Sequence, residues 1–170
     1  ELLVTEKKYE VNGEKRLYFS ELYLECHAPL SQKSKLDIVT RAVEQVNRKY
    51  YGDDDAERKM EIKNVIYREL EEEGAIKVES LREKVFPDSP EMQTAFDEKM
   101  EKYNLSYETV QPKNEQTVKK FQSQRLTTDT GIEITIPMEE YQNPDRVEFI
   151  TNPDGTISVL IKNIGHLMSK

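Results

Sequence analysis

The chain has 170 residues, 36% of them apolar and 34% charged, with a formal net charge of −8. This length suits one domain, or two small ones, with a buried core. No apolar run approaches the roughly 20 residues that a membrane-spanning helix needs, so we expect a soluble protein. The single cysteine, Cys26, excludes an intramolecular disulfide framework and fits a reducing compartment.

The acidic charge is concentrated in the middle of the chain. Residues 52–116 hold 10 basic and 18 acidic residues, whereas residues 1–51 hold 9 and 8, and residues 117–170 hold 6 and 7. An acidic surface repels the phosphates of nucleic acid. Any contact with nucleic acid is therefore expected at the two ends of the chain.

Residues 1–30 are predicted to form a β-hairpin. Asn12-Gly13 suits the positive φ angles of a type I′ turn, and strand-forming residues flank it. The two strands are expected at about residues 3–11 and 15–26. Because the chain begins with Glu1, inside the first of these strands, we expect it to be a piece of a longer protein.

Residues 31–116 are predicted to form an acidic block of about four helices. The first helix begins at Ser31 or Ser34 and ends near Tyr51. Its core face is marked by apolar residues at helical spacing, which are Leu36, Val39, Val43, Val46 and Tyr50. Further helices are expected at about residues 56–73, 79–85 and 91–103. Residues 104–116 are polar and are expected to be irregular.

Residues 117–170 are predicted to form β-hairpins, with turns at residues 129–131 and 152–155. Apolar residues alternate with polar ones on both sides of these turns, which is typical of half-buried strands. The expected strands cover about residues 121–128, 132–136, 147–150 and 157–161, with one helical turn at 138–141. The predicted fold class is therefore α+β, with residues 117–170 forming one compact domain together with residues 1–30.

The most suggestive catalytic motif is Asp129-Thr130-Gly131, which matches the Asp-Thr-Gly of aspartic proteases. Those enzymes need two such loops, whose carboxylates share a proton. The preceding residues 125–128 are largely polar, and Asp and Gly suit a turn for backbone reasons, so a plain hairpin turn is favoured. An aspartic-type hydrolase is the remote alternative, and the prediction is that the chain is not an enzyme.

No metal or cofactor site is predicted. Cys26-His27 lacks further ligands at zinc spacing, since the other histidine is His166 near the far end. The aspartates at residues 53–55 lack the alternating carboxylates of a calcium loop and suit the cap of the following helix. The sequence also has no Gly-rich phosphate-binding loop.

Two basic clusters are candidate DNA-binding sites. One lies on the first helix, and the other lies beside the aromatic and amide side chains of residues 121–124. The candidates are Arg41, Arg48 and Lys49, with Lys33 and Lys35 nearby, and Lys119, Lys120 and Arg125. An ordinary exposed charged face is the favoured alternative. A helix-turn-helix over residues 79–103 is disfavoured, because its second helix would bring four carboxylates to the DNA phosphates.

Several segments of the chain together resemble a known family. They are residues 121–134 (FQSQRLTTDTGIEI), 141–144 (YQNP), 150–158 (ITNPDGTIS) and 161–164 (IKNI), with the segment 18–26 and the helix that follows it. The segments within residues 121–164 resemble the C-terminal part of bacterial nucleoid-associated proteins of the NdpA-like family, and residues 18–26 with the following helix resemble the middle of these proteins. The resemblance implies a location in the bacterial cytoplasm at the nucleoid, association with chromosomal DNA and no enzymatic activity. It also implies that the N-terminal half of the protein lies outside this chain.

Two functional hypotheses follow. In the first, the chain associates with chromosomal DNA, directly or through partners. In the second, it is a protein-interaction or dimerisation module without direct DNA contact. Its hairpin edges would then pair in a homodimer, or its acidic helices would dock a basic protein partner.

Overall fold

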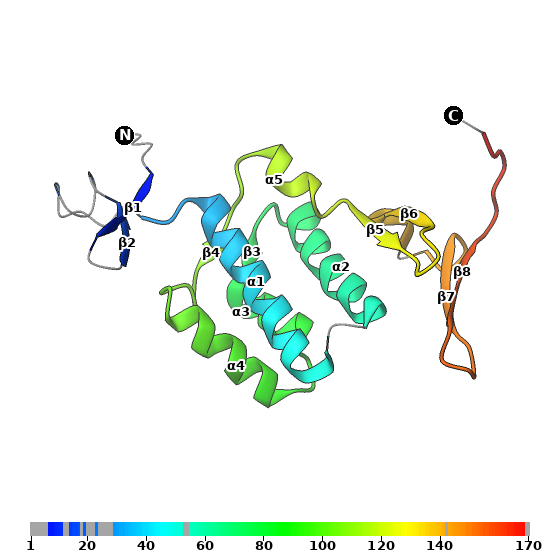
Figure 1. The fold of residues 1–170 in the computed structure, drawn as a ribbon, viewed down its shortest axis with the longest axis horizontal. Helices are drawn as coiled ribbons and strands as arrows, with labels where there is room; N and C mark the ends of the chain where they lie inside the picture. The colour runs from blue at the N-terminus through cyan, green and yellow to red at the C-terminus, as the bar shows by residue number, and fades with distance from the viewer. Residues whose placement is uncertain are drawn as a thin grey trace. The chain divides into compact units, whose positions relative to one another are not determined.

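The computed structural model describes residues 7–11, 14–17, 19, 23, 29–52, 55–141 and 143–168. Helices and antiparallel hairpins make up these ranges (Figure 1), which confirms the α+β fold class. The chain divides into two compact units, residues 1–31 and residues 32–170. The predicted joining of residues 117–170 with residues 1–30 stays a prediction. Among the residues that the structure describes, no helix combines the length and the apolar composition needed to span a lipid bilayer.

The first unit contains the predicted N-terminal hairpin. Strand β1 (Lys8–Val11) pairs with β2 (Glu14–Leu17) in antiparallel register, with Val11 opposite Glu14. The two residues of the Asn-Gly turn lie outside the described residues, as do Cys26 and His27.

The predicted extension of the second strand to residue 26 is wrong at Phe19 and Tyr23, which adopt helical backbone. Their rings stack with centroids 5.7 Å apart. Residues four apart lie close together on one side of a helical turn, but on a strand they would be separated by about 13 Å. Stacking of this aromatic pair is therefore compatible with a helical turn and not with a strand.

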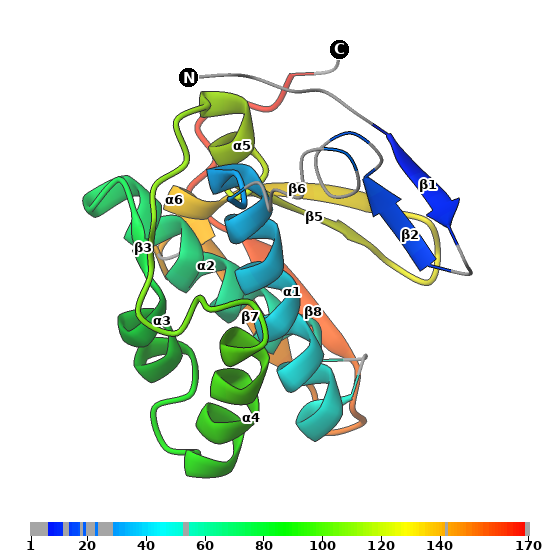
Figure 2. The ribbon, with the colours of Figure 1, turned by 90° about the vertical axis from the view of Figure 1, so that its left-hand side faces the viewer.

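The second unit begins with four helices close to the predicted positions. They are α1 (Gln32–Tyr51), α2 (Ala56–Glu72), α3 (Val78–Val85) and α4 (Pro90–Glu101). Four members of the predicted apolar stripe of α1 are fully buried, since Leu36, Val39, Val43 and Val46 are all 0% exposed. The prediction is wrong for the fifth, Tyr50, which lies in the last turn of the helix and is 39% exposed. α1 packs against α4, and α3 packs against α2 (Figures 1 and 2).

The ends of α2 follow from local chemistry. The Asp55 side chain caps the first turn by accepting the Arg58 backbone N–H at 2.8 Å, which agrees with the predicted capping role of this acidic run. Asp53 and Asp54 lie outside the described residues. After the helix, Gly74 adopts a φ of 65°, a left-handed conformation that strains residues with a side chain.

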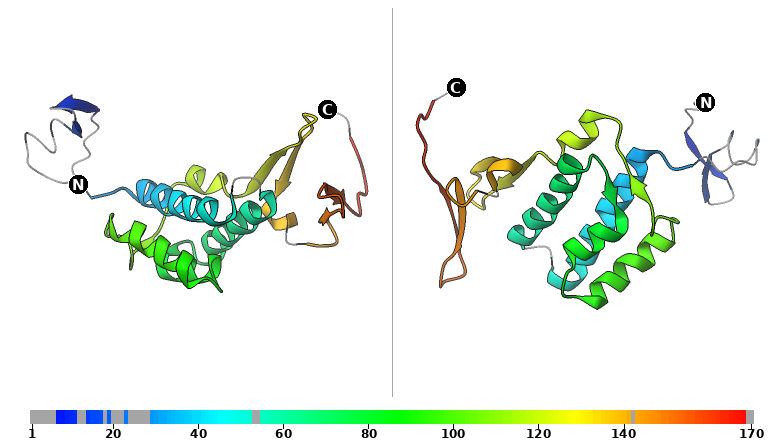
Figure 3. Two further views of the ribbon diagram at one scale, coloured as in Figure 1. Left: turned by 60° about the horizontal axis from the view of Figure 1, so that its bottom comes forward. Right: turned by 180° about the vertical axis from the view of Figure 1, so that it is seen from behind.

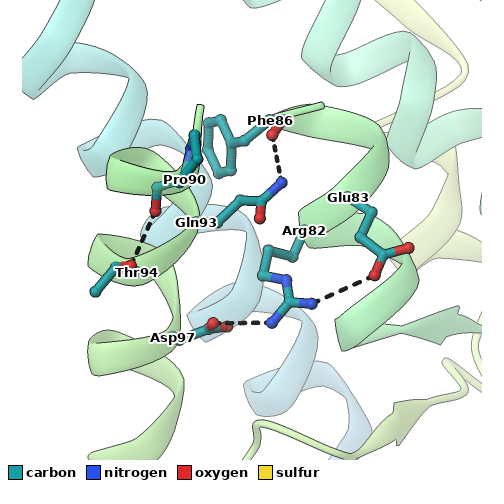
Figure 4. A network of polar contacts seen from close by, with 7 residues as sticks. All are labelled: Arg82, Glu83, Phe86, Pro90, Gln93, Thr94 and Asp97. Carbon is teal, nitrogen blue, oxygen red and sulfur yellow. Dashed lines mark hydrogen bonds and ion pairs between the residues drawn. The ribbon is translucent and has the colours of Figure 1, made fainter. Parts of the chain in front are cut away.

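Polar contacts join α3 to α4 (Figure 4). The Arg82 guanidinium donates to the Asp97 carboxylate at 2.9 Å, and the Gln93 amide donates to the Phe86 carbonyl at 2.7 Å. The hydrogen bond to Asp97 raises the pKa of Arg82 above its usual range. Because Asp97 is engaged in this contact, part of the acidic charge of α4 serves the packing of the two helices.

The segment expected to be irregular contains a short strand. β4 (Thr109–Val110) pairs with β3 (Ile76–Lys77), and both Ile76 and Val110 are fully buried. A two-residue strand is too short to show a period of two, so its sequence carries no alternation of apolar and polar residues that would predict it. Helix α5 (Glu115–Lys119) follows.

Two hairpins and a short helix complete the second unit. Strand β5 (Ser123–Thr127) pairs with β6 (Glu133–Pro137), and β7 (Val147–Thr151) pairs with β8 (Ile157–Ile161); α6 (Met138–Tyr141) lies between them. Figure 3 shows the β5–β6 hairpin in yellow near α2, and the β7–β8 hairpin in orange farther from that helix. A small apolar cluster of Met60, Ile136 and Val147 attaches them to that helix. The four strands and the helical turn agree with the sequence predictions to within one or two residues.

The helical core should depend strongly on Phe96 of α4. This residue is 0% exposed, and its ring lies 6.2 Å from that of Phe86. Phe96→Ala removes a buried ring and leaves a cavity, so the free energy of unfolding should fall by about 3–5 kcal/mol in urea denaturation. Tyr107→Ala is the control, because Tyr107 is 89% exposed and its removal should change that free energy by less than about 0.5 kcal/mol. Equal effects of the two changes would contradict the assignment of the core.

Candidate nucleic-acid interface

A basic cavity of about 390 Å³ lies between α1, α2 and the segment that joins α5 to β5. Among the described residues that line it, four are cations and one is a carboxylate, although the whole chain has a net charge of −8. The lining residues are Thr40, Glu44, Asn47, Arg48, Lys59, Ile62, Lys63, Ile66, Lys120, Phe121 and Gln124. We call this feature the basic cavity.

Helix α1 contributes one wall. Glu44 and Arg48 are one helical turn apart beside the buried stripe, and both are exposed. Asn47 lies between them in sequence and is only 2% exposed. Its Oδ1 accepts no hydrogen bond from the described residues. A buried amide oxygen without a donor is rare in proteins and favours a ligand or water at that position.

Helix α2 contributes the opposite wall through Lys59 and Lys63, which are also one turn apart. The Lys63 ammonium is half-buried and donates to the Ser123 carbonyl at 2.7 Å and to the Gln124 side-chain oxygen at 3.0 Å. Both acceptors are uncharged. Burial lowers the pKa of Lys63, the nearby Glu44 carboxylate opposes this effect, and the Lys120 charge adds to it.

The third wall comes from Lys120, Phe121 and Gln124. The Lys120 ammonium forms an ion pair with Asp37 at 2.6 Å and lies 5.0 Å from the centre of the Phe121 ring. Phe121 is 3% exposed and joins the main core. The hydrogen bond from Lys120 holds the pKa of Asp37 below its usual value, and the charges of Lys33 and Arg41 act in the same direction.

The whole chain matches a known family. A family model described as nucleoid-associated protein YejK matches residues 1–168. The chain belongs to this family. The comparisons with curated proteins and with solved structures give no match. Membership in the nucleoid-associated protein YejK family confirms the resemblance found in the sequence and supports a nucleoid-associated role in bacteria.

The two basic clusters predicted for this YejK-family chain meet at the basic cavity, where Arg48 of the first cluster and Lys120 of the second line the same space. Arg41, Lys49 and Lys119 are exposed but do not line it. Lys49 lies over the Tyr50 ring at 5.2 Å.

Two further predicted cations, like Lys120, form ion pairs with carboxylates. Arg125 pairs with Glu133 across the β5–β6 hairpin, and Lys35 pairs with Glu108 at 2.8 Å. DNA contact by any of the predicted residues stays a prediction.

Lys59 and Lys63 were not among the site residues predicted from the sequence. Their spacing of four residues, beside the buried Ile62 and Ile66, places them at the edge of the apolar face of α2. That spacing is visible in the sequence. It becomes significant only once α2 is known to face α1 and the start of β5.

The Asp-Thr-Gly motif lies in the exposed turn between β5 and β6. The Asp129 side chain accepts the backbone N–H of Thr130 at 3.0 Å, and the strands on either side pair Thr127 with Glu133. This confirms the predicted hairpin turn. Across the ranges that the structure describes, no group of three or more histidine, cysteine or acidic side chains is arranged to hold a metal ion.

The ion pair of Lys120 with Asp37 should make a small contribution to stability that depends on pH. A carboxyl whose pKa is lowered by folding stabilises the protein above its unfolded pKa, near 3.8, and loses this effect as pH falls through the folded pKa. Because the pair is partly exposed, Asp37→Asn should lower the free energy of unfolding at pH 7 by no more than about 1 kcal/mol. In urea denaturation, the difference from the wild type should shrink below pH 3.8. A difference that grows at acidic pH would contradict this account.

Proposed function

We propose that this chain is a non-enzymatic module of the bacterial nucleoid that binds chromosomal DNA directly through the face around the basic cavity. One observation carries the proposal, namely that Arg48, Lys59, Lys63 and Lys120 converge from three separate segments of an otherwise acidic chain. Cations gathered at one place create a local positive potential that attracts DNA phosphates despite the overall charge. The family match supports the nucleoid setting.

The acidic helices restrict where DNA can lie. Glu91, Glu98 and Glu101 are exposed on α4 and disfavour the close approach of a phosphate backbone to that helix. The basic cavity is formed instead by α1, α2 and the start of β5. The proposed orientation therefore presents α1 and α2 to the duplex and leaves α4 in solvent.

Binding should be sequence-independent and sensitive to salt. If four cations contact phosphates, a plot of the logarithm of the binding constant against the logarithm of salt concentration should have a slope of about −3 to −4. Fluorescence anisotropy with a labelled duplex at several salt concentrations measures this slope. The Arg48→Glu/Lys59→Glu variant should bind at least about tenfold more weakly at low salt, with a slope reduced by about 2.

The matched control for this experiment is Lys77→Glu/Lys113→Glu. It makes the same change in net charge at two exposed lysines that do not line the basic cavity. Its affinity should stay close to that of the wild type. An equal loss in both double variants would show that only net charge matters, and no binding by the wild type at low salt would rule out direct DNA contact by this chain.

Homodimerisation is the second candidate, favoured by the β7–β8 hairpin. This sheet has only two strands in the described part of the chain, so each strand has an unpaired edge. Ile157, Leu160 and Ile161 of β8 are 56%, 43% and 54% exposed, which leaves apolar surface on both faces of the hairpin. Open edges with apolar side chains pair readily with another strand, and a second copy of the chain offers a matching one.

The dimer hypothesis predicts a mass above that of the monomer in light scattering at high protein concentration. Ile161→Lys should shift the protein towards the monomer, because a charge would be buried in the paired sheet. Ile132→Lys is the control, since Ile132 is 61% exposed but lies at the turn of the other hairpin. A strictly monomeric wild type would exclude this candidate.

A further inference from the structure

We propose that the basic cavity also binds a small phosphorylated ligand with an apolar body, of the nucleoside monophosphate class. This inference goes beyond the DNA contact proposed above, because it concerns the interior of the cavity rather than the exposed face around it. It is carried by three properties of the lining: the placement of the cations, the burial of Asn47 and the apolar floor.

The cations provide the phosphate site. Lys63 projects from α2 to the start of β5, where its ammonium is half-buried and donates, among the described residues, to the uncharged Ser123 carbonyl and Gln124 side-chain oxygen. A partly desolvated ammonium with neutral partners binds an anion more strongly than an exposed one does. Lys120, whose own carboxylate partner is Asp37, lines the same cavity. A phosphate near Lys63 would supply the charge compensation that the neutral acceptors lack.

Asn47 provides the polar recognition of the ligand body. It is 2% exposed, it lines the cavity, and its Oδ1 has no hydrogen-bond donor among the described residues. Leaving such an oxygen unpaired is unfavourable, because burial has removed its contact with water without supplying a donor. A ligand with a hydroxyl or amino group placed beside the phosphate would satisfy it. Inorganic phosphate alone offers fewer donors and no body to reach this position.

The floor of the cavity is apolar and suits a planar ring. Ile62 and Ile66 of α2 are 5% and 1% exposed and lie beside Phe121 in the lining. A volume of about 390 Å³ falls within the usual range for small-molecule sites, which combine an apolar lining with a few placed polar groups. A nucleoside monophosphate carries all three matching parts, because it has a phosphate, hydroxyl donors and a planar base.

The test is titration of the whole chain with adenosine 5′-monophosphate, inorganic phosphate and adenosine at constant ionic strength, by calorimetry and by amide shifts in NMR spectra. The monophosphate should bind with a Kd of about 0.1–1 mM and shift the amides of Asn47, Lys63 and Gln124. Adenosine and inorganic phosphate should each bind at least about tenfold more weakly, because each lacks one part of the recognition. Equal binding of the monophosphate and inorganic phosphate, or shifts confined to residues outside the lining, would overturn the proposal.

Variants separate ligand binding from folding. Glu44→Gln removes the carboxylate that the described residues contribute to the lining, at an exposed position, and should tighten monophosphate binding about threefold. Glu98→Gln is the matched control on α4, outside the lining, and should leave the affinity unchanged.

Lys63→Met should weaken binding of the monophosphate at least about tenfold. Because this last change also removes two hydrogen bonds, the gain expected for Glu44→Gln keeps the proposal testable if the Lys63 variant fails to fold.

The two proposals for this cavity fail in different ways. Salt-dependent binding of duplex DNA without any binding of the monophosphate would overturn the small-ligand site and leave the proposed DNA contact standing. Binding of the monophosphate by a chain that ignores duplex DNA at low salt would support the small-ligand site and remove the DNA contact.

Discussion

Burial of the apolar stripe of α1 is the constraint on which the rest of the second unit depends. Leu36, Val39, Val43 and Val46 are fully buried, so the rotation of this helix about its own axis is fixed. Once the stripe faces the core, Thr40, Glu44 and Arg48 must emerge along one edge of it. The wall of the basic cavity is thus a geometric consequence of core packing.

Acidic and basic side chains are concentrated in different parts of this protein. Carboxylates predominate on the middle helices, and some of them serve packing, as Asp97 does with Arg82 between α3 and α4. Cations are brought together where α1, α2 and β5 converge, and there Lys63 is partly desolvated beside neutral acceptors. Such a placement opposes folding of the isolated chain, because burial disfavours the charged form. Groups held in this way are frequent at binding sites.

The sequence predicted elements with a strong internal period and missed those without one. The alternating three- and four-residue spacing of apolar residues along α1 was sufficient to place a helix, and the two-residue spacing of Ile134 and Ile136 was sufficient to place a strand. Strand β4 has two residues and therefore no period, and Phe19 with Tyr23 fits a strand and a helical turn equally well by spacing. The basic cavity could be predicted only in part. Arg48 and Lys120 were recognised as cations, but their meeting with Lys63 depends on tertiary packing.

Pairing of the strands into separate two-stranded sheets has a consequence for the dynamics of the chain. In the described ranges, β7–β8 shares no ladder with β5–β6, so each hairpin can open without breaking the hydrogen bonds of the other. Amide protons of β7 and β8 would then exchange with solvent through local opening, while those at the centre of α1 would exchange only on global unfolding. If a further strand paired with the edge of β8, amide exchange with solvent would slow in this hairpin more than in any other part of the molecule.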